Sequence, residues 1–464
     1  MEQSTTAAGT VTLTERSNSA RKSSLCRECS YSATSGDRRS EYYSLPNATM
    51  HGITFNFAMQ IDILKLFKPC QRGSPRQSIV IFGGLMTGGA LCSEGQVTNK
   101  RCAWPARFER WIRQLLGDCI TVYNFARGGT QSEVALSMIP VTLNTFMKQN
   151  GQHPTLVITD FSVNDVYEMN GNVGRNSLLS ALGEYSDQEK GAAVAESLII
   201  TLRNLTNDKS RTRHWMMLSH HPKSFEDAGL MNAHERIARL HGVPVFDTRS
   251  LWPSYWRPKG AHPDFRTHEL LASLLARSIC SSCTQSDAPQ FYARSALRDK
   301  LPSCTRPTTV HSAYDHASPI DEQYVGEWKL IQDRPSKPGW VATVANSTLT
   351  LPVRFGATPL LMVNYLRSYE GMACVNMSMN GLNVTLDGAW SKRVSTTASF
   401  FSQAYANTIQ APARDDNHYG IIGFNVRPNS AQNISFTLIQ CLDDRNSSVI
   451  RQIRKFKLID IITC

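Results

Sequence analysis

Four short segments hold the residues whose types suit chemistry on an acyl group. The first three directly follow short apolar runs, and the fourth directly precedes a helical pattern. They are residues 83–89 (GGLMTGG), 124–132 (NFARGGTQS), 160–165 (DFSVND) and 259–263 (KGAHP). Glycine N–H groups and the amide of Asn164 can stabilise a negatively charged oxygen, and the imidazole of His262 can transfer a proton. Acyl transfer uses these groups together when a nucleophile lies beside them.

Each segment also has a simpler structural explanation. The glycine pairs could form an ordinary strand-to-loop turn, and a phosphate loop is disfavoured because no Lys-Ser or Lys-Thr follows them. Asn164 could cap a turn, and His262 could lie on the surface at the start of a helix. Three aromatic residues before the last segment could pack under the sheet or form a shelf for a sugar or acyl chain: Trp252, Tyr255 and Trp256.

The elements that must position these segments form a repeating pattern over residues 76–278. Short apolar runs predict strands at 78–82, 120–124, 155–160, 215–219 and 243–246. Helical periods predict helices at 104–116, 133–147 with a kink at Pro140, 189–202, 231–240 and 267–277. Strand and helix alternate five times, which predicts a parallel five-stranded sheet covered by helices, with chemistry at the carboxyl ends of the strands.

The regions outside this repeat have a different composition. Residues 1–50 are rich in Ser, Thr and Arg and are expected to be disordered. Residues 279–325 are rich in Ser, Pro and Cys and are interpreted as a linker. From 326 to 464 the helical period disappears, and apolar residues alternate with polar ones between Asn, Asp, Gly and Pro turns. This pattern predicts a second, all-β domain of the sandwich type.

The order, spacing and strand-end placement of the four segments resemble those of SGNH (GDSL-like) hydrolases, a family of esterases and lipases. The resemblance covers roughly residues 76–278 and implies a three-layer α/β/α domain in which a serine attacks an ester and a histidine takes its proton. It implies His262 as the base, and Gly129 and Asn164 as oxyanion donors. The third donor would be the backbone N–H of Leu85.

The chain departs from the family pattern at two positions of the catalytic triad. Leu85 stands where the family has its serine, and leucine has no nucleophilic atom. Lys259 stands where the family has its aspartate, and lysine cannot accept a hydrogen bond from an imidazolium. Loss of such a nucleophile typically lowers turnover about a millionfold.

Nearby residues could restore the missing groups. Thr87 or Ser93 could present a hydroxyl, and Asp264 or Asp247 could replace the acid. The requirement is strict, because attack geometry tolerates an error of only about 1 Å. Thr87 is therefore a candidate substitute nucleophile rather than an expected one.

Two functions from different classes remain open. In the first, the protein is an ester hydrolase that acts on acyl or carbohydrate esters. In the second, it is a catalytically inactive pseudoenzyme that binds a glycan or protein through the former cleft and the β domain. A purely structural surface protein is a third hypothesis. We expect an ester or glycan ligand, and the oligomeric state is left open.

The composition of the chain limits the classes of partner and cofactor that we expect. The 464 residues carry a net charge of +11 and 41% apolar residues, which is a globular composition with a basic surface that attracts polyanions. No dense Lys/Arg run indicates a nucleic-acid groove, and no window reaches the length of a membrane span. We expect no cofactor and no metal, because Cys26/Cys29 and Cys280/Cys283 lie far apart and the adjacent His220 and His221 point to opposite faces of a strand.

The evidence on the compartment conflicts. Twelve cysteines favour disulfides or buried thiols, and together with the Asn-x-Ser/Thr sequons they favour a secretory lumen or the extracellular space. The sequons lie at Asn47, Asn204, Asn346, Asn376, Asn383, Asn433 and Asn446. The N-terminal segment, in contrast, lacks the apolar region of a signal peptide.

Overall fold

A computed structural model of the chain describes most of both domains. The described residues are 67, 70, 73–92, 99–169, 186–206, 213–218, 228–248, 262–281, 304–314, 327–334, 337–369, 371–380, 382–389, 395–404, 422–424, 426–441 and 455–464. Several residues considered above lie outside them: the segment 1–50, Ser93, His220, His221, Trp252, Tyr255, Trp256, Lys259, Cys26, Cys29 and Cys283.

The first domain is built on a five-stranded parallel sheet, as its alternating pattern predicts. Its strands are β1 (Gln77–Gly83), β2 (Ile120–Asn124), β3 (Leu156–Asp160), β4 (Arg213–Leu218) and β5 (Val245–Asp247). They are arranged in the order β2-β1-β3-β4-β5. All residues of β1 and β3 are buried. Both faces of the sheet are covered, which explains why these strands read as continuous apolar runs rather than as alternating ones.

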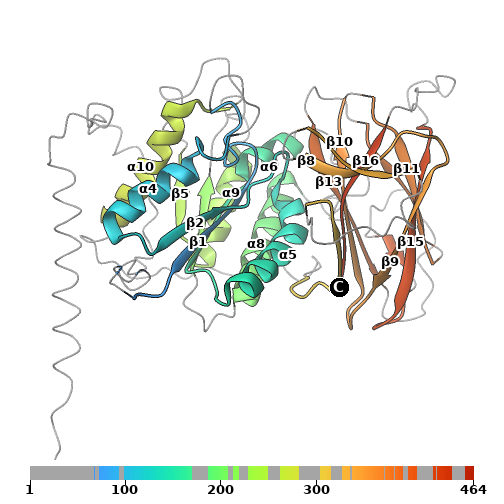
Figure 1. Cartoon of the computed structure of the whole chain (residues 1–464), viewed down its shortest axis with the longest axis horizontal. Helices are drawn as coiled ribbons and strands as arrows, with labels where there is room; N and C mark the ends of the chain where they lie inside the picture. The colour runs from blue at the N-terminus through green and yellow to red at the C-terminus, as the bar shows by residue number, and fades with distance from the viewer. Residues whose placement is uncertain are drawn as a thin grey trace, which may run out of the picture.

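Helices cover both faces of the sheet, so the domain has three layers (Figure 1). One layer contains α4 (Trp104–Leu116) and α10 (Phe265–Ser281), which share a core with the sheet. The other contains α5 (Ser132–Asn150), α8 (Asp187–Thr206) and α9 (Ala228–Leu240). A short helix, α6 (Ser162–Met169), begins inside the third segment, where the sequence pattern shows no separate helix.

Helix α4 illustrates how the sequence specifies these elements. Four residues spaced by four, Trp104, Phe108, Ile112 and Leu116, form one buried stripe against the sheet. Pro105 occupies the first turn, where a missing N–H costs nothing. The helix therefore has the bounds that its apolar period predicts.

The second domain consists of two sheets packed face to face, and their strand pairs are antiparallel except for the parallel pair β13 and β14. The larger sheet has the order β14-β13-β10-β16-β8-β7, with β6 also paired to β16, and the smaller has the order β12-β11-β15-β9. Their inner faces share one core. The strands are β6 (Thr309–Ser312), β7 (Lys329–Arg334), β8 (Lys337–Ala342), β9 (Thr348–Arg354), β10 (Leu360–Arg367), β11 (Cys374–Met379), β12 (Leu382–Asp387), β13 (Thr396–Ala404), β14 (Ile422–Phe424), β15 (Ala431–Ile439) and β16 (Phe456–Thr463). Strand β6 falls within the range 279–325 interpreted as a linker, yet it belongs to the larger sheet.

Strand β10 joins the two domains because both of its faces are buried. Leu361 and Val363 point into the sandwich core, whereas Leu360 and Met362 pack with α5 in the core of the first domain. The next residue on that outer face is Asn364, whose Nδ2 donates to Ser137 Oγ of α5 at 2.9 Å and whose Oδ1 accepts from Ser399 Oγ at 2.6 Å. The β domain thus lies against α5, on the side of the sheet opposite α4 and α10 (Figure 1).

Four disulfides crosslink the described residues, and each domain contains at least one. They join Cys70 to Cys119, Cys92 to Cys102, Cys304 to Cys464 and Cys374 to Cys441. Disulfides of this number are typical of proteins in a secretory lumen or outside the cell. In the part of the chain that the structure describes, no helix has the length and apolarity needed to cross a bilayer.

Candidate active site

The first three segments meet at the carboxyl edge of the sheet, around the strands where the order reverses. Strand β1 pairs with β2 on one side and with β3 on the other, so crossovers leave in opposite directions and open a crevice there. The segment after β1 turns tightly, with Gly88 N–H donating to Gly84 O at 3.0 Å and Ala90 N–H to Leu85 O at 3.0 Å.

The second segment is fastened directly to this turn. Asn124 Nδ2 donates to Thr87 O at 2.9 Å, and Arg127 N–H donates to Gly83 O at 3.0 Å. These bonds bring Gly128 against the side chain of Leu85, so that a Cβ atom placed on Gly128 would lie 2.5 Å from Leu85 Cδ2. A larger residue at position 128 would therefore require the Leu85 side chain to shift.

The third segment contributes Asn164, which lies against the first and second segments. Its Nδ2 donates to Thr130 O at 2.5 Å, and a Cβ atom on Gly84 would come within 2.1 Å of the same nitrogen. The next residue, Asp165, is buried and accepts from both Ser132 N and Ser132 Oγ at 2.7 Å, which fixes the start of α5. Glycine, leucine and asparagine from three separate loops therefore share one small region.

The residue at position 85, just after β1, has a hydrocarbon side chain. Leu85 is half-buried, and its branch lies over Gly128. Thr87, the candidate substitute, is fully buried, and its Oγ1 donates to Asp160 Oδ2 at 2.5 Å. A hydroxyl in that position is oriented into the protein interior and bonded to a carboxylate, which argues against attack on a bound ester.

His262 lies just before α10. Its Nδ1 is buried and has no hydrogen-bond partner among the described residues. Burial lowers the pKa of His262, and the positive charge of Lys337 lowers it further. Asp264, a possible replacement acid, instead caps α10: its Oδ1 accepts from the N–H groups of Arg266 at 3.0 Å and Thr267 at 3.1 Å.

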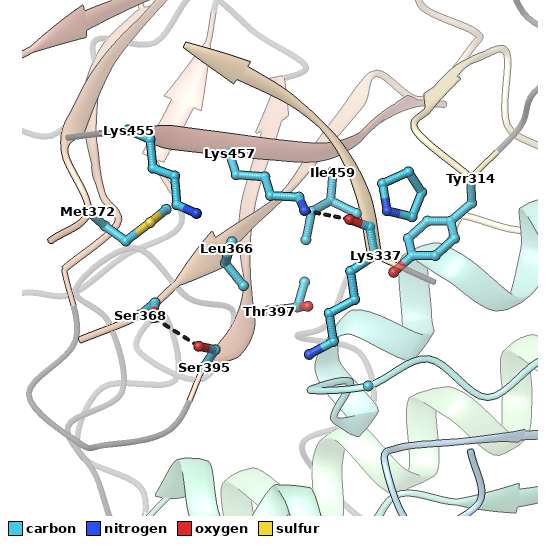
Figure 2. Close-up of a pocket in the computed structure, with 12 residues that line it drawn as sticks. Tyr314, Lys337, Leu366, Ser368, Met372, Ser395, Thr397, Lys455, Lys457 and Ile459 are labelled. Carbon is cyan, nitrogen blue, oxygen red and sulfur yellow. Dashed lines mark hydrogen bonds between the residues drawn. The ribbon is translucent and has the colours of Figure 1, made fainter. Parts of the chain in front are cut away.

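The β domain reaches into the same region, which the sequence pattern does not reveal. Gly129 O accepts from Thr397 N–H at 2.9 Å and from Thr396 Oγ1 at 3.3 Å, so the start of β13 lies on the second segment. Lys337 of β8 extends toward the first domain, and its Cε would lie 3.2 Å from a Cβ atom on Gly128 (Figure 2). No local signal links these residues, because more than 200 positions separate them along the chain.

A cavity of about 750 Å³ opens beside this contact. Its walls come from the second segment, from α5 and from the β domain, including Phe125, Thr142, Phe146, Tyr314 and Lys337. A smaller depression continues from it past Gly128 into the β domain, and Figure 2 shows its lining. The volume is that of a site for a small molecule or a few sugar units.

A possible metal site also fails on chemical grounds. Cys374, Asp387 and Cys441 lie close together, but the two sulfurs form a disulfide and so cannot act as thiolate ligands.

Comparisons with known proteins agree on the fold. No protein-family model and no curated protein matches the chain. Among solved structures, it is similar to a two-domain esterase (CEX) active on acetylated mannans, with a TM-score of 0.54 and 17% identity over 89% of this chain and 97% of that one. The same esterase co-crystallised with mannopentaose matches equally well. A lipase/acylhydrolase from Enterococcus faecalis matches with a TM-score of 0.32 and 15% identity over 44% of this chain and 96% of that one.

The two-domain similarity confirms the predicted architecture. The chain has an SGNH-like three-layer α/β/α domain followed by a β-sandwich-like domain, and it resembles ester hydrolases in fold.

Proposed function

We propose that the protein is a non-hydrolytic relative of ester hydrolases that binds a glycan where the parallel sheet meets the β domain. The observation that carries this proposal is the packing of Leu85 on Gly128 at the nucleophile position. A branched hydrocarbon there removes the attacking atom and fills the space that a serine hydroxyl would need.

The state of the neighbouring groups supports the same conclusion. The Thr87 hydroxyl donates its hydrogen bond to Asp160. The Nδ1 atom of His262 is buried and has no hydrogen-bond partner in the described part of the chain that would orient the ring. A histidine base needs both a nearby hydroxyl and an orienting acceptor to act efficiently. Gly129 and Asn164 remain at the sheet edge. Their N–H groups can donate hydrogen bonds to a ligand oxygen without hydrolysis of the ligand.

The glycan part of the proposal rests on the cavity. Its lining combines the aromatic rings of Phe125 and Tyr314 with hydroxyl and amide groups such as those of Thr142 and Gln149. Sugars present apolar faces and hydroxyl edges, which these two kinds of group complement. The similar two-domain esterase was co-crystallised with mannopentaose, which supports a glycan as the ligand class.

A paired measurement tests this proposal. The purified full chain is treated with a fluorophosphonate probe and with p-nitrophenyl acetate, beside an active esterase as a positive control, and its glycan binding is measured by calorimetry. We expect no labelling, no hydrolysis above the buffer rate, and saturable binding of oligosaccharides. Stoichiometric labelling that His262→Ala abolishes would instead establish the ester-hydrolase alternative.

We further propose that the outer face of the smaller β sheet carries N-linked glycans. Strand alternation places the sequon residues Asn376 and Asn383 on that face, with Ser378 and Thr385 beside them, because residues i and i+2 share a side. Asn433 lies on the same face of β15 and is exposed. This arrangement supports a lumenal or extracellular location.

A further inference from the structure

A row of polar side chains crosses the face of the larger β sheet that packs on the α/β domain. Strand register places Ser312 of β6 and Asn364 of β10 opposite Asp460 of β16, and Ser399 of β13 opposite Asn364. Ser312 Oγ donates to Asp460 Oδ1, and Asn364 Nδ2 donates to Asp460 Oδ2 at 3.1 Å. All four side chains are buried. Ile462, two residues from Asp460 on the same strand face, packs in the core of the first domain, so the row lies at the domain boundary.

Asp460 forms an ion pair across this boundary. Its Oδ2 lies 3.5 Å from Nη1 of Arg127, a residue of the second segment. The side chains of Arg127 and Asp460 are 19% and 4% exposed, so water screens their attraction only weakly. Removal of one member of a buried pair leaves the other charge without compensation. The conformation of the Arg127 side chain therefore depends on a residue of the other domain.

The backbone of Arg127 is held separately, within the α/β domain. Its N–H donates to Gly83 O at 3.0 Å, which fixes the peptide unit on the loop after β1. The α/β domain thus sets where the Arg127 side chain begins, and the β domain sets where its guanidinium ends.

This guanidinium stacks on an aromatic ring of the cavity wall. Arg127 Cζ lies 3.9 Å from the centroid of the Tyr314 ring. Tyr314 N–H donates to Ser312 Oγ at 3.2 Å, so the hydroxyl that donates to Asp460 also holds the backbone beside the ring. Arg127, Ser312 and Tyr314 all line the cavity of about 750 Å³. Asp460 lies behind them and contacts two of the three.

The hydroxyl of Tyr314 stays neutral in this setting. Burial raises its pKa to about 12, while the charge of Arg127 lowers the pKa and the charge of Asp460 raises it. A phenol that keeps its proton can both donate and accept a hydrogen bond, which suits a sugar hydroxyl.

We propose that Asp460 is a positioning residue of the glycan cavity, which holds Arg127 and Tyr314 as a preformed wall for the ligand. The inference rests on the proposed glycan-binding function and assigns control of that wall to the β domain. Asp460 acts through Arg127 rather than by touching the ligand. An arginine that is already ordered loses less conformational entropy when a ligand binds, so the ion pair raises affinity.

A role confined to domain docking would look different. Asn364, in the same row, donates to Ser137 Oγ of α5 at 2.9 Å and so stabilises the packing of the two domains. Asp460 differs from Asn364 because its carboxylate reaches two side chains that line the cavity, Arg127 and Ser312. Its removal should therefore change the cavity wall as well as stability.

Arginine modification reports the position of Arg127 without any ligand. The full chain with its disulfides intact is treated with phenylglyoxal, and the modification rates of Arg127 and Arg110 are read by peptide mass spectrometry. The Arg110 side chain is 67% exposed and serves as the reference within each sample. We expect Asp460→Asn to raise the rate at Arg127 about fivefold relative to Arg110, because the guanidinium loses its anionic partner. Asp460→Glu, which keeps the charge, should raise it less than about twofold.

A buried carboxylate elsewhere provides the matched control. Glu196 is fully buried, its Oε1 lies 2.7 Å from His241 Nε2, and neither residue lines the cavity. Glu196→Gln should lower stability but leave the Arg127 rate unchanged. If Asp460→Asn does not fold, judged by circular dichroism, Ser312→Ala removes one donor to the same carboxylate and should raise the rate about threefold.

Calorimetry with three probes, mannopentaose, cellopentaose and chitopentaose, measures the effect on binding. We expect Asp460→Asn to weaken the probe that the wild-type chain binds best about tenfold. In the Arg127→Met background the same substitution should change affinity less than about twofold, because the residue through which Asp460 acts is gone.

The outcomes separate the two proposals. An unchanged Arg127 rate in Asp460→Asn, or an equal rise in Glu196→Gln, would overturn the positioning role. A tenfold loss of affinity that persists in the Arg127→Met background would also overturn it. Failure of all three probes to bind the wild-type chain would refute the proposed function, while the modification rates would still decide whether Asp460 positions Arg127.

Discussion

Leu85 and Gly128 pack so closely that a Cβ atom on Gly128 would lie 2.5 Å from Leu85 Cδ2. The contact joins the loops after β1 and β2 at the carboxyl edge of the parallel sheet. It places the apolar side chain at position 85 directly over the glycine at position 128.

Replacing Leu85 and Lys259 with the serine and aspartate that the resemblance implies at these positions should create esterase activity. We expect Leu85→Ser with Lys259→Asp to hydrolyse p-nitrophenyl acetate at least tenfold faster than the wild-type protein, because Gly129 and Asn164 are already at the sheet edge. Leu85→Ser alone should gain less, since the His262 ring would still lack an orienting acid. The measurement is initial rate with fluorophosphonate labelling. A folded double variant that takes up no label would show that the oxyanion groups are not aligned.

The loop after β1 should be sensitive to a single methyl group. Gly84→Ala places a Cβ atom 2.1 Å from Asn164 Nδ2, so we expect a loss of about 2 kcal/mol of unfolding free energy in urea titration. Gly88→Ala is the matched control, because its new Cβ would meet atoms at 3.4 Å or beyond. The control should change stability by less than about 0.5 kcal/mol. Equal effects of the two substitutions would contradict this geometry.

The interface between the domains should depend on Asn364. This residue is fully buried and bonds to Ser137, Ser399 and Asp460, so Asn364→Ala leaves several buried polar groups without partners. We expect a loss of about 3 kcal/mol in unfolding free energy. Asn144→Ala, on a partly exposed position of α5, should change it by less than about 0.5 kcal/mol. A comparable loss in both variants would mean that the Asn364 bonds contribute nothing specific.

Acid should destabilise the α/β domain through its buried histidines. Burial lowers the pKa of His214 to about 3, of His234 to about 4 and of His268 to about 3, from an ordinary value of 6.5. In the unfolded chain these rings bind protons below pH 6.5, so stability is full above that pH and is lost as pH falls toward 4.

The size of this effect is measurable. Each histidine adds a slope of about 1.4 kcal/mol per pH unit inside its window. We expect His234→Gln to lower the slope of unfolding free energy against pH between 6 and 4.5 by about that amount. The exposed His153→Gln should leave it unchanged. An unaltered slope in His234→Gln would show that this ring is protonated in the folded protein.

The proposed glycan face makes a prediction about mass. Protein produced in a eukaryotic secretory system should shift in mobility on endoglycosidase treatment, and Asn383→Gln should remove one glycan because Asn383 is exposed. Asn380→Gln is the control, because Asn380 lies outside any sequon and its substitution should leave the mass of the attached glycans unchanged. An unchanged mass after treatment would refute modification at this face.

Local patterns predicted most of the framework. The bounds of α4 and β2 agree with their apolar periods, and the five parallel strands agree with five short apolar runs, because burial on one or two faces imposes a period that is visible over a few residues. The order of the segments at the strand ends follows from the same alternation, since parallel strands place their carboxyl ends at one edge.

The hydrogen bonds of the candidate site residues could be determined only from the tertiary structure. In the sequence, Thr87 is a residue with a hydroxyl group near the end of a predicted strand. Only the structure shows that Gly83, which has no side chain, leaves room for this hydroxyl to point inward toward Asp160. Its direction depends on side chains 73 positions away. A hydrogen bond between residues so far apart produces no periodic pattern in the sequence, so the sequence alone cannot predict it.

The sequence alone therefore determined the layers, the loops that carry the candidate groups, and the presence of leucine and lysine at positions 85 and 259. The tertiary structure decided that β13 would lie on Gly129 and that Lys337 would stand beside Gly128 and lower the pKa of His262. The physical reason is that secondary structure follows from residues a few positions apart, whereas a charge acts across space, and its neighbours are set by how two separately patterned domains pack.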